Sequence, residues 1–276
     1  MTRVLLCTSG GLYGSMVMER LLADPEVAVV GIVKSTRVLH PAYGWLRGAV
    51  AQMRRSGPAY TLYLGCATTF PELLGRWSGV PTVSINARRR RIPLCTTRDI
   101  NGSVERGFIA DCRPDLLVSA FFNQRIGLQV CRLPVAGAVN IHPSLLPAFK
   151  GVDPVFFARL HGAPFLGVTV HRVTEEFDRG PVLAQAEVDV DAAASLLAAT
   201  AKLFVHGAGL LLDCLPGILR GEPGQAQAAG GSYDSWPTPE QVNSFLRGGN
   251  RLVRLADAGL LRQGALGVLL GDRLEK

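Results

Sequence analysis

The stretch Ala138-Val139-Asn140-Ile141-His142-Pro143-Ser144 places two polar side chains, Asn140 and His142, one residue apart at the end of a short apolar run. Side chains two positions apart on a β-strand leave the same face of the sheet. Asn140 and His142 can therefore converge on one point if they end a strand. The stretch predicts a strand that delivers an amide and an imidazole to its carboxyl end.

Strands and helices alternate along the chain on both sides of this stretch. The continuous apolar run at residues 27–33 is typical of a buried parallel strand. The remaining expected elements are strands at residues 4–7, 81–85, 116–119 and 136–141, a glycine turn at 9–15, a helix at 16–23, a strand pair at 165–173 and 181–190, and a long helix at 192–215. Such alternation predicts an α/β fold with a doubly wound, mostly parallel, Rossmann-like sheet. Ligands of these sheets bind beyond the carboxyl ends of the strands, where Asn140 and His142 lie.

A carboxylate follows in the segment Glu175-Glu176-Phe177-Asp178-Arg179-Gly180-Pro181, where Asp178 comes 36 residues after His142. An amide N–H and an imidazolium can stabilise the oxyanion that forms when an amine attacks a carbonyl carbon. A carboxylate beside the histidine can relay the proton that the attacking nitrogen loses. Asn140, His142 and Asp178 are therefore the candidate catalytic residues. The alternative is that Asn140 and Asp178 only bond their own loops and that His142 is a core histidine.

The segments 138–147, Gly151, 167–171 and 178–182 together resemble the formyltransferases that use 10-formyltetrahydrofolate. This family includes the glycinamide ribonucleotide, methionyl-tRNA and sugar N-formyltransferases. The resemblance is strong from about residue 114 to 190 and weak in much of the remaining chain. It implies that Asn140, His142 and Asp178 are the catalytic trio, and that 10-formyltetrahydrofolate is the co-substrate.

By the same resemblance, folate recognition falls on residues 119–126, where backbone groups bond the pterin and apolar side chains sandwich it. The implied residues are Phe121, Phe122, Asn123, Gln124, Arg125 and Ile126. Phe122 and Ile126 are the expected sandwich. The alternative is that Phe121 and Phe122 belong to the core.

The expected acceptor contacts are Ser9, Gly10, Gly11, Ser144 and Arg179. A glycine-rich turn at a helix start offers backbone N–H groups to an anion, and the purine enzymes of the family hold a phosphate at the equivalent turn. The alternative is a tight turn capped by a serine. Ser144 is expected to order its loop, and Arg179 to face an anionic part of the acceptor.

We expect a catalytic domain at residues 1–222 and a small C-terminal appendage at 223–276 that packs against it. Residues 36–79 form an insert that is unusual for the family and rich in aromatic residues, namely Tyr43, Trp45, Tyr60, Tyr63, Phe70 and Trp77. The insert is interpreted as extra core, as a surface for a homodimer, or as a lid over the acceptor site. In the appendage, Thr238-Pro239-Glu240 predicts the start of a helix.

Composition is consistent with a cytoplasmic enzyme. The chain has 276 residues with 48% hydrophobic content, and its six cysteines are scattered without a Cys-x-x-Cys pair. This predicts reduced thiols, and neither a zinc site nor a disulfide framework. No apolar run approaches the roughly 20 residues of a membrane span, so no membrane contact is expected.

The net charge of +7 suits a polyanionic partner but serves solubility equally well. The basic run at residues 88–91 is interpreted as a solvated loop, with a phosphate contact as the alternative. Binding to nucleic acid is not expected, because only some 50 residues follow Gly221, too few for the β-barrel that the methionyl-tRNA enzymes carry after the catalytic domain.

These observations predict transfer of a formyl group from 10-formyltetrahydrofolate to an amine of a small-molecule acceptor. A formyltetrahydrofolate hydrolase, in which water replaces the amine, is one alternative. The regulatory domain that often precedes the catalytic domain in those hydrolases is not expected here. A catalytically silent folate-binding protein is the other alternative, and the retained trio speaks against it.

Overall fold

A computed structural model describes residues 1–40, 42–78 and 82–260 of the chain. Its centre is a seven-stranded sheet with the order β3-β2-β1-β4-β5-β7-β8. The strands are β1 (Thr2–Thr8), β2 (Val27–Ser35), β3 (Leu94–Thr97), β4 (Leu116–Ala120), β5 (Ala138–His142), β7 (Leu166–Arg172) and β8 (Val182–Val188). The pairs from β3 to β5 are parallel, and β5–β7 and β7–β8 are antiparallel. The predicted α/β class and mostly parallel sheet are confirmed.

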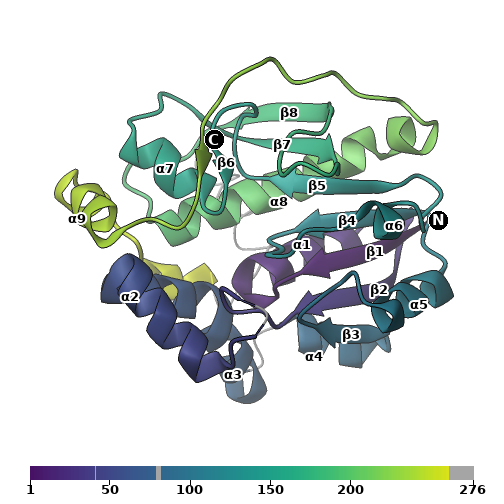
Figure 1. Ribbon diagram of the computed structural model, residues 1–276, viewed down its shortest axis with the longest axis horizontal. Helices are drawn as coiled ribbons and strands as arrows, with labels where there is room; N and C mark the ends of the chain where they lie inside the picture. Colours follow the sequence, from purple (N-terminus) through teal and green to yellow (C-terminus); the bar gives the residue numbers. More distant parts are fainter. Residues whose placement is uncertain (41, 79–81, 261–276) are drawn as a thin grey trace.

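Helices cover both faces of this sheet, as expected for a doubly wound fold (Figure 1). The long helices α1 (Gly11–Leu22) and α8 (Leu196–Leu219) pack together over one face and form the larger hydrophobic core. The second core lies on the other face, under α5 (Ser103–Cys112) and α6 (Leu128–Cys131). Burial of β1 and β4 between these two layers explains why their residues are apolar almost throughout.

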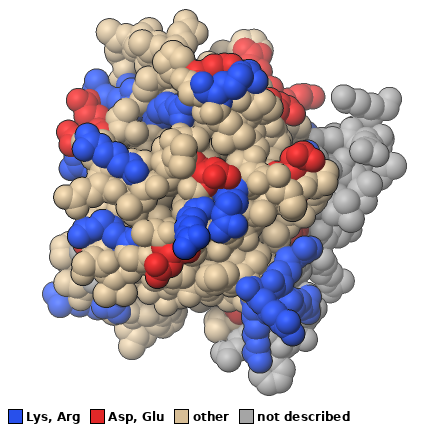
Figure 2. All heavy atoms as spheres, turned by 90° about the vertical axis from the view of Figure 1, so that its right-hand side faces the viewer, with Lys and Arg blue, Asp and Glu red and all other residues tan. Residues whose placement is uncertain are grey.

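The parallel strands all end at one edge of the sheet, which lies on the left of Figure 1. This edge carries the insert helices α2 (Trp45–Leu64), η1 (Gly65–Thr69) and α3 (Phe70–Ser78), together with α7 (Pro154–Leu160) and α9 (Pro239–Arg247). The opposite edge holds the amino ends of the strands. Figure 2 shows this opposite face, on which basic and acidic side chains are interspersed.

Three local predictions are wrong. Helix α1 begins at Gly11 and not at residue 16, so residues 11–15 are helical and do not form a turn. Residues 83–85 begin the helix α4 (Val83–Arg90), because Thr82 caps it by accepting a hydrogen bond from the backbone N–H of Ile85 at 3.2 Å. Pro81, where the expected strand began, lies outside the described residues. The basic run 88–91 forms the exposed last turn of α4, where positive charge suits the helix dipole, and is not a loop. The edge strand β3 follows directly and was not expected.

The residues after α8 pack back against the rest of the chain. The short strand β9 (Tyr233–Asp234) pairs in parallel with β6 (Lys150–Gly151), and α9 contacts α2 and α7. Thr238 and Gln241 form a capping box at the start of α9, with Pro239 in the first turn, as the sequence predicts. The 3-10 turn η2 (Leu255–Asp257) holds the start of α8 through a hydrogen bond from Ser195 Oγ to Asp257 Oδ2 at 2.7 Å.

Within the described ranges, α8 alone is long and apolar enough to cross a membrane. Half of its apolar window is buried inside the protein, where it packs against β5, β7 and β8. Its apolar character is therefore that of a core helix.

Candidate active site

Asn140 and His142 lie at the carboxyl end of β5, with one residue between them. On one side β5 pairs in parallel with β4, and on the other it pairs with β7 so that Asn140 stands opposite His171 and His142 opposite Thr169. His142 is buried, at 4% exposure, whereas Asn140 is partly exposed. The antiparallel partner therefore adds a second imidazole, that of His171, to the pair that the sequence singles out.

His171 holds the side chain of Asn140 in one orientation. Its Nδ1 lies 2.9 Å from the carbonyl of Arg172, and its Nε2 lies 3.1 Å from Asn140 Nδ2. Burial, and then the neighbouring His142, lower the pKa of His171 to about 4, so the ring is neutral at pH 7. A neutral ring that donates from Nδ1 must accept at Nε2. Asn140 therefore donates one N–H to His171 and keeps a second N–H free.

Asp178 reaches the same place from the loop that follows β7. Its Oδ1 lies 3.5 Å from His142 Nδ1 and 3.8 Å from His171 Nε2. The other ring nitrogen of His142, Nε2, lies 3.0 Å from the carbonyl of Phe149. Since a carbonyl only accepts, Nε2 carries a proton, and Nδ1 is the atom that can exchange a proton with Asp178.

Several backbone contacts fix the position of Asp178. Its Oδ2 accepts the N–H of Gly151 at 3.0 Å, and its own carbonyl accepts from Gln227 Nε2 at 2.9 Å. Asp178 has a φ of 54°, a left-handed conformation that aspartate tolerates better than most residues. A Cβ on Gly180 would lie 1.7 Å from the carbonyl of Arg172, so only glycine fits there. Contacts from three separate segments thus hold the carboxylate against His142.

The residues expected to bind folate follow β4. The side chains of Gln124 and Ile126 are buried, and Gln124 bonds Ser35, Thr97 and Ile100. Asn123 bonds Ser35 and the carbonyl of Arg37. The rings of Phe121 and Phe122 are half-buried and pack against opposite cores. Of the six, only Arg125 lines the pocket beside Asp178, and the folate role of the other five stays a prediction.

The residues expected to bind the acceptor lie in different surroundings. At the glycine turn, Ser9 Oγ accepts the N–H of Asn123, and a Cβ on Gly11 would lie 2.1 Å from the carbonyl of Ala67. The insert therefore closes the space beside Gly11, and Gly10 and Gly11 are both buried. This packing favours a tight turn over a phosphate site, but the expected serine cap is wrong, because Gly10 is the N-cap of α1 and no side chain caps the helix.

The other two expected acceptor contacts are Ser144 and Arg179, which differ in their exposure to solvent. Ser144 is 4% exposed and donates from Oγ to the carbonyl of Ala148, which orders the loop after β5. Arg179 is exposed and pairs with Glu176, with 3.1 Å between Arg179 Nε and Glu176 Oε2. Arg179 can therefore reach a ligand, whereas the Ser144 hydroxyl is committed to its own loop.

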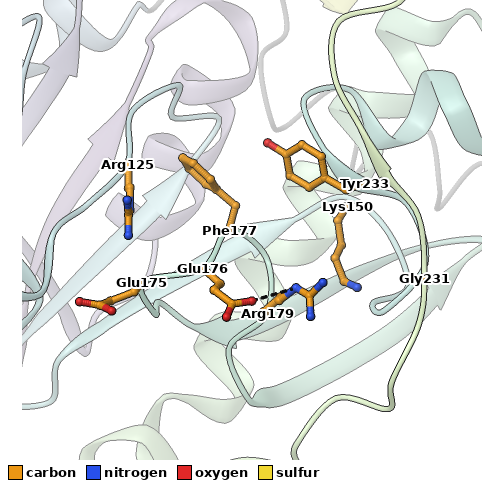
Figure 3. A pocket seen from close by; sticks show the side chains of 8 residues that line it. All are labelled: Arg125, Lys150, Glu175, Glu176, Phe177, Arg179, Gly231 and Tyr233. Carbon is orange, nitrogen blue, oxygen red and sulfur yellow. Dashed lines mark ion pairs between the residues drawn. The ribbon is translucent and has the colours of Figure 1, made fainter.

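A pocket of about 380 Å³ is lined by Phe177 and Arg179, the two neighbours of Asp178 in the chain (Figure 3). Its other lining residues are the basic Arg125 and Lys150, the acidic Glu175 and Glu176, Gly231 and Tyr233. Burial, and then the charge of Asp178, raise the pKa of Tyr233. The volume of the pocket is in the range of small-molecule sites, and the pocket opens between the loop after β4 and the loop that carries Asp178. Rings and donors of this kind fit a flat heteroaromatic ligand that also carries negative charge.

None of the insert side chains that the structure describes lines this pocket. Tyr60 and Tyr63 are buried, and Tyr60 Oη donates to Asp153 Oδ2 at 2.7 Å, whereas Trp45 is 60% exposed. Trp77 falls outside the residues whose side chains are described. The buried tyrosines of the insert therefore add to the core, and no described insert side chain forms a lid over this pocket, whereas the exposed Trp45 and Leu46 leave a homodimer surface as a prediction.

The sequence did not assign roles to His171, Gly151 or Gln227. His171 and Gly151 lie within the segments that carry the family resemblance, which was the available signal. Gln227 lies in an irregular stretch between α8 and β9 and has no such signal. In the part of the chain that the structure describes, no group of three or more His, Cys, Asp or Glu side chains could hold a metal ion.

The segment that carries Asn140, His142 and Asp178 matches a known protein family. Residues 101–212 match the formyl transferase family. The methionyl-tRNA formyltransferase of Roseiflexus castenholzii is 36% identical over 209 residues, which is 76% of this chain and 56% of that protein. The enzyme of Bacillus licheniformis is 35% identical over 141 residues, which is 51% of this chain and 45% of that protein. The chain thus spans about half the length of these curated relatives.

Solved structures share the fold. A phosphoribosylglycinamide formyltransferase from Bacillus halodurans has a TM-score of 0.53 at 20% identity, covering 79% of this chain and 95% of that one. A sugar N-formyltransferase from a Shewanella species has a TM-score of 0.53 at 19% identity, covering 85% and 77%. Together, the family match and the methionyl-tRNA formyltransferase relatives support a formyltransferase family for this chain. The relatives that define this family are enzymes.

Proposed function

We propose that this protein transfers a formyl group from 10-formyltetrahydrofolate to an amine of a small-molecule acceptor. The observation that carries the proposal is the convergence of Asn140, His142 and Asp178 from two distant segments, with 3.5 Å between His142 Nδ1 and Asp178 Oδ1. The pocket beside them has the size and the mixture of rings and donors that a folate requires. The donor supplies an activated formyl carbon, and the protein supplies orientation and proton transfer.

Each residue of the trio has a separate role in this proposal. The second N–H of the partly exposed Asn140 side chain, which is not used by His171, polarises the formyl oxygen. His142, with its Nε2 proton held by Phe149, exchanges a proton at Nδ1 with Asp178. Asp178 removes the proton from the attacking amine, directly or through water, and this proton passes to N10 of the departing tetrahydrofolate as its bond to the formyl carbon breaks. His171 keeps Asn140 in place and is a positioning residue.

A small amine suits the structure better as the acceptor than a nucleotide whose phosphate is held at residues 9–11, because the insert closes the space beside Gly11. Methionyl-tRNA is the second candidate acceptor, because the matched relatives are methionyl-tRNA formyltransferases. Nothing in the site or in the relatives supports hydrolysis. A screen should therefore offer amino sugars, amino acids and methionyl-tRNA in parallel.

The test is formyl transfer by the purified protein with 10-formyltetrahydrofolate and each acceptor, followed by mass spectrometry of the product. Asp178→Asn keeps an oxygen for the N–H of Gly151 and removes only the base. We expect it to lower transfer by at least about a hundredfold, the lower end for a positioned acid or base. Formation of free formate without any formylated amine would support the hydrolase. Near-normal transfer by Asp178→Asn would reject the trio.

A further inference from the structure

Lys150 is a buried cation for which the proposed chemistry has no use. It is 4% exposed and lies in β6, directly before Gly151, whose N–H binds Asp178. Its Nζ donates to the carbonyl of Gly230 at 2.6 Å. An ammonium has three donors, and no other acceptor or carboxylate among the described residues bonds this one. A buried charge without a counter-ion is costly unless a partner satisfies it.

Arg179 brings a second cation to the same pocket. Lys150 directly precedes Gly151 in the chain, and Arg179 directly follows Asp178. A hydrogen bond joins Gly151 to Asp178, so each cation is next to one of the two bonded residues. In Figure 3 the amino group of Lys150 and the guanidinium of Arg179 lie in the lower part of the view, and the rings of Phe177 and Tyr233 lie above them. The pocket therefore combines these two cations and Arg125 with two aromatic rings and the carboxylates of Glu175 and Glu176.

Glu176 supplies a carboxylate that already pairs with Arg179 in this pocket. Its carboxylate pairs with Arg179 at 3.1 Å, although both side chains are mostly exposed, at 71% and 62%. Pairs so exposed contribute little, so a ligand carboxylate that also reaches Lys150 can replace Glu176. A planar carboxylate matches the fork of donors that arginine presents.

We propose that Lys150 and Arg179 form a binding site for a substrate carboxylate next to Asp178. The carboxylate comes either from the glutamate of the folate or from an acceptor that is an amino acid. Assigning it to a substrate rests on the formyl transfer proposed above, whereas binding of the anion does not. The alternative role of Lys150 is purely structural, in which its bond to Gly230 only fastens the tail.

The first experiment is a titration of the ¹⁵N-labelled protein with glutarate, followed by NMR of the backbone amides of Gly151, Arg179 and Gly231. We expect these signals to shift and saturate. Lys150→Gln keeps a donor for Gly230 and should weaken glutarate binding about tenfold, because it removes a buried charge. Arg179→Gln should weaken it about threefold, as expected for an exposed charge. Arg89→Gln, which removes an exposed charge from α4, is the matched control and should bind as the wild type does.

Shifts that do not saturate, or equal affinities in all four proteins, would overturn the site. This titration needs no folate, so absence of formyl transfer by the wild type would count against the proposed function alone. If Lys150→Gln fails to fold, Arg179→Gln still decides the outcome, because Arg179 is exposed.

The second experiment identifies the source of the carboxylate. Calorimetry compares 10-formyltetrahydrofolate with 10-formyltetrahydropteroate, which lacks the glutamate. Transfer assays compare lysine with lysinamide as acceptors. The source is the ligand whose carboxylate improves binding or kcat/KM in the wild type and loses that advantage in Lys150→Gln and Arg179→Gln. If neither carboxylate gives an advantage, the assignment to a substrate is wrong.

Discussion

At the scale of single residues, the protonation of His171 decides what Asn140 can do. His171 donates from Nδ1 to a backbone carbonyl and accepts at Nε2, so it must stay neutral to hold Asn140. Burial, and then the nearby His142, keep it neutral by lowering its pKa to about 4. A protonated His171 would have two donors facing Asn140 and Arg172 and would release the amide.

We predict that His171→Leu lowers formyl transfer more than His171→Gln does. Leucine removes the acceptor of the Asn140 N–H, whereas glutamine offers its Oε1 in nearly the same place. Loss of one oriented oxyanion donor costs about a hundredfold or more in kcat. Steady-state kinetics measure kcat and KM for both variants, and a reduction confined to KM in His171→Leu would contradict the positioning role.

His171 also predicts how stability depends on pH. Its pKa is near 6.5 in the unfolded chain and about 4 in the fold, so the unfolded state binds more protons between these values. Stability from this residue is therefore complete above about pH 6.5 and is lost as the pH falls toward 4. The full effect is on the order of 3 kcal/mol. Urea unfolding at pH 4.5 and 7 should show a smaller difference for His171→Gln than for the wild type.

At the scale of elements, the insert supports the site from behind through a buried hydrogen bond. Tyr60 of α2 donates to Asp153, and Asp153 caps α7 by accepting from the N–H of Phe156 at 3.3 Å. Gly151, which binds Asp178, lies two residues before Asp153. The helix α2 thus fixes the start of α7 and, through it, the backbone that holds the carboxylate.

We predict that Tyr60→Phe destabilises the protein by about 1–3 kcal/mol, because it leaves a buried carboxylate oxygen of Asp153 without its donor. Chemical denaturation measures the change. Met53→Ala is a suitable control, since Met53 lies on the same helix but is half exposed, at 50%. Equal effects of the two substitutions would show that the hydroxyl is unimportant.

Asp153 gives a further prediction with the opposite dependence on pH. Burial raises its pKa from about 3.8 to about 6, so the folded state binds more protons than the unfolded state between these values. Its contribution to stability therefore falls as the pH rises from 4 to 6. The side chain of Asp153→Asn does not titrate. The free energy of unfolding of this variant should therefore rise relative to that of the wild type by on the order of 2–3 kcal/mol between pH 4 and 6. Denaturation measures both proteins at pH 4 and 7, and the same difference in free energy of unfolding at the two pH values would contradict the prediction.

At the scale of the whole molecule, residues far apart in sequence form one layer at the carboxyl edge of the sheet. Phe245 of α9 is fully buried and stacks on Phe156 of α7 with 4.6 Å between ring centroids, and Phe156 in turn contacts Tyr60. The pairing of β9 with β6 continues this layer to the pocket. The tail after α8 is therefore an integral part of the described fold.

We predict that Phe245→Ala lowers the free energy of unfolding by about 3–5 kcal/mol, because it empties a fully buried ring site. Leu255→Ala, at a residue 98% exposed, should change it by less than about 0.5 kcal/mol. Thermal and urea unfolding measure both. A single cooperative transition is expected for the wild type, and a separate early transition in Phe245→Ala would show that the tail unfolds alone.

The sequence by itself determined the parts that depend on neighbours along the chain. Apolar runs predicted β1, β2, β4 and β5, and spacing placed Asn140 and His142 on one face of a strand end. Thr238 and Pro239 marked the start of α9. Where a local signal was ambiguous, as at residues 81–85, a cap from Thr82 turned an expected strand into a helix.

Only the tertiary structure decided how distant segments meet. The N–H of Gly151 and the side chain of Gln227 hold Asp178 from separate loops, the carbonyl of Ala67 closes the turn at Gly11, and β9 buries Lys150 beside the pocket. These contacts join residues that are 27 to 83 positions apart, so no local pattern encodes them. They arise because each buried polar group must find a partner in whichever segment the packing of the core brings to it.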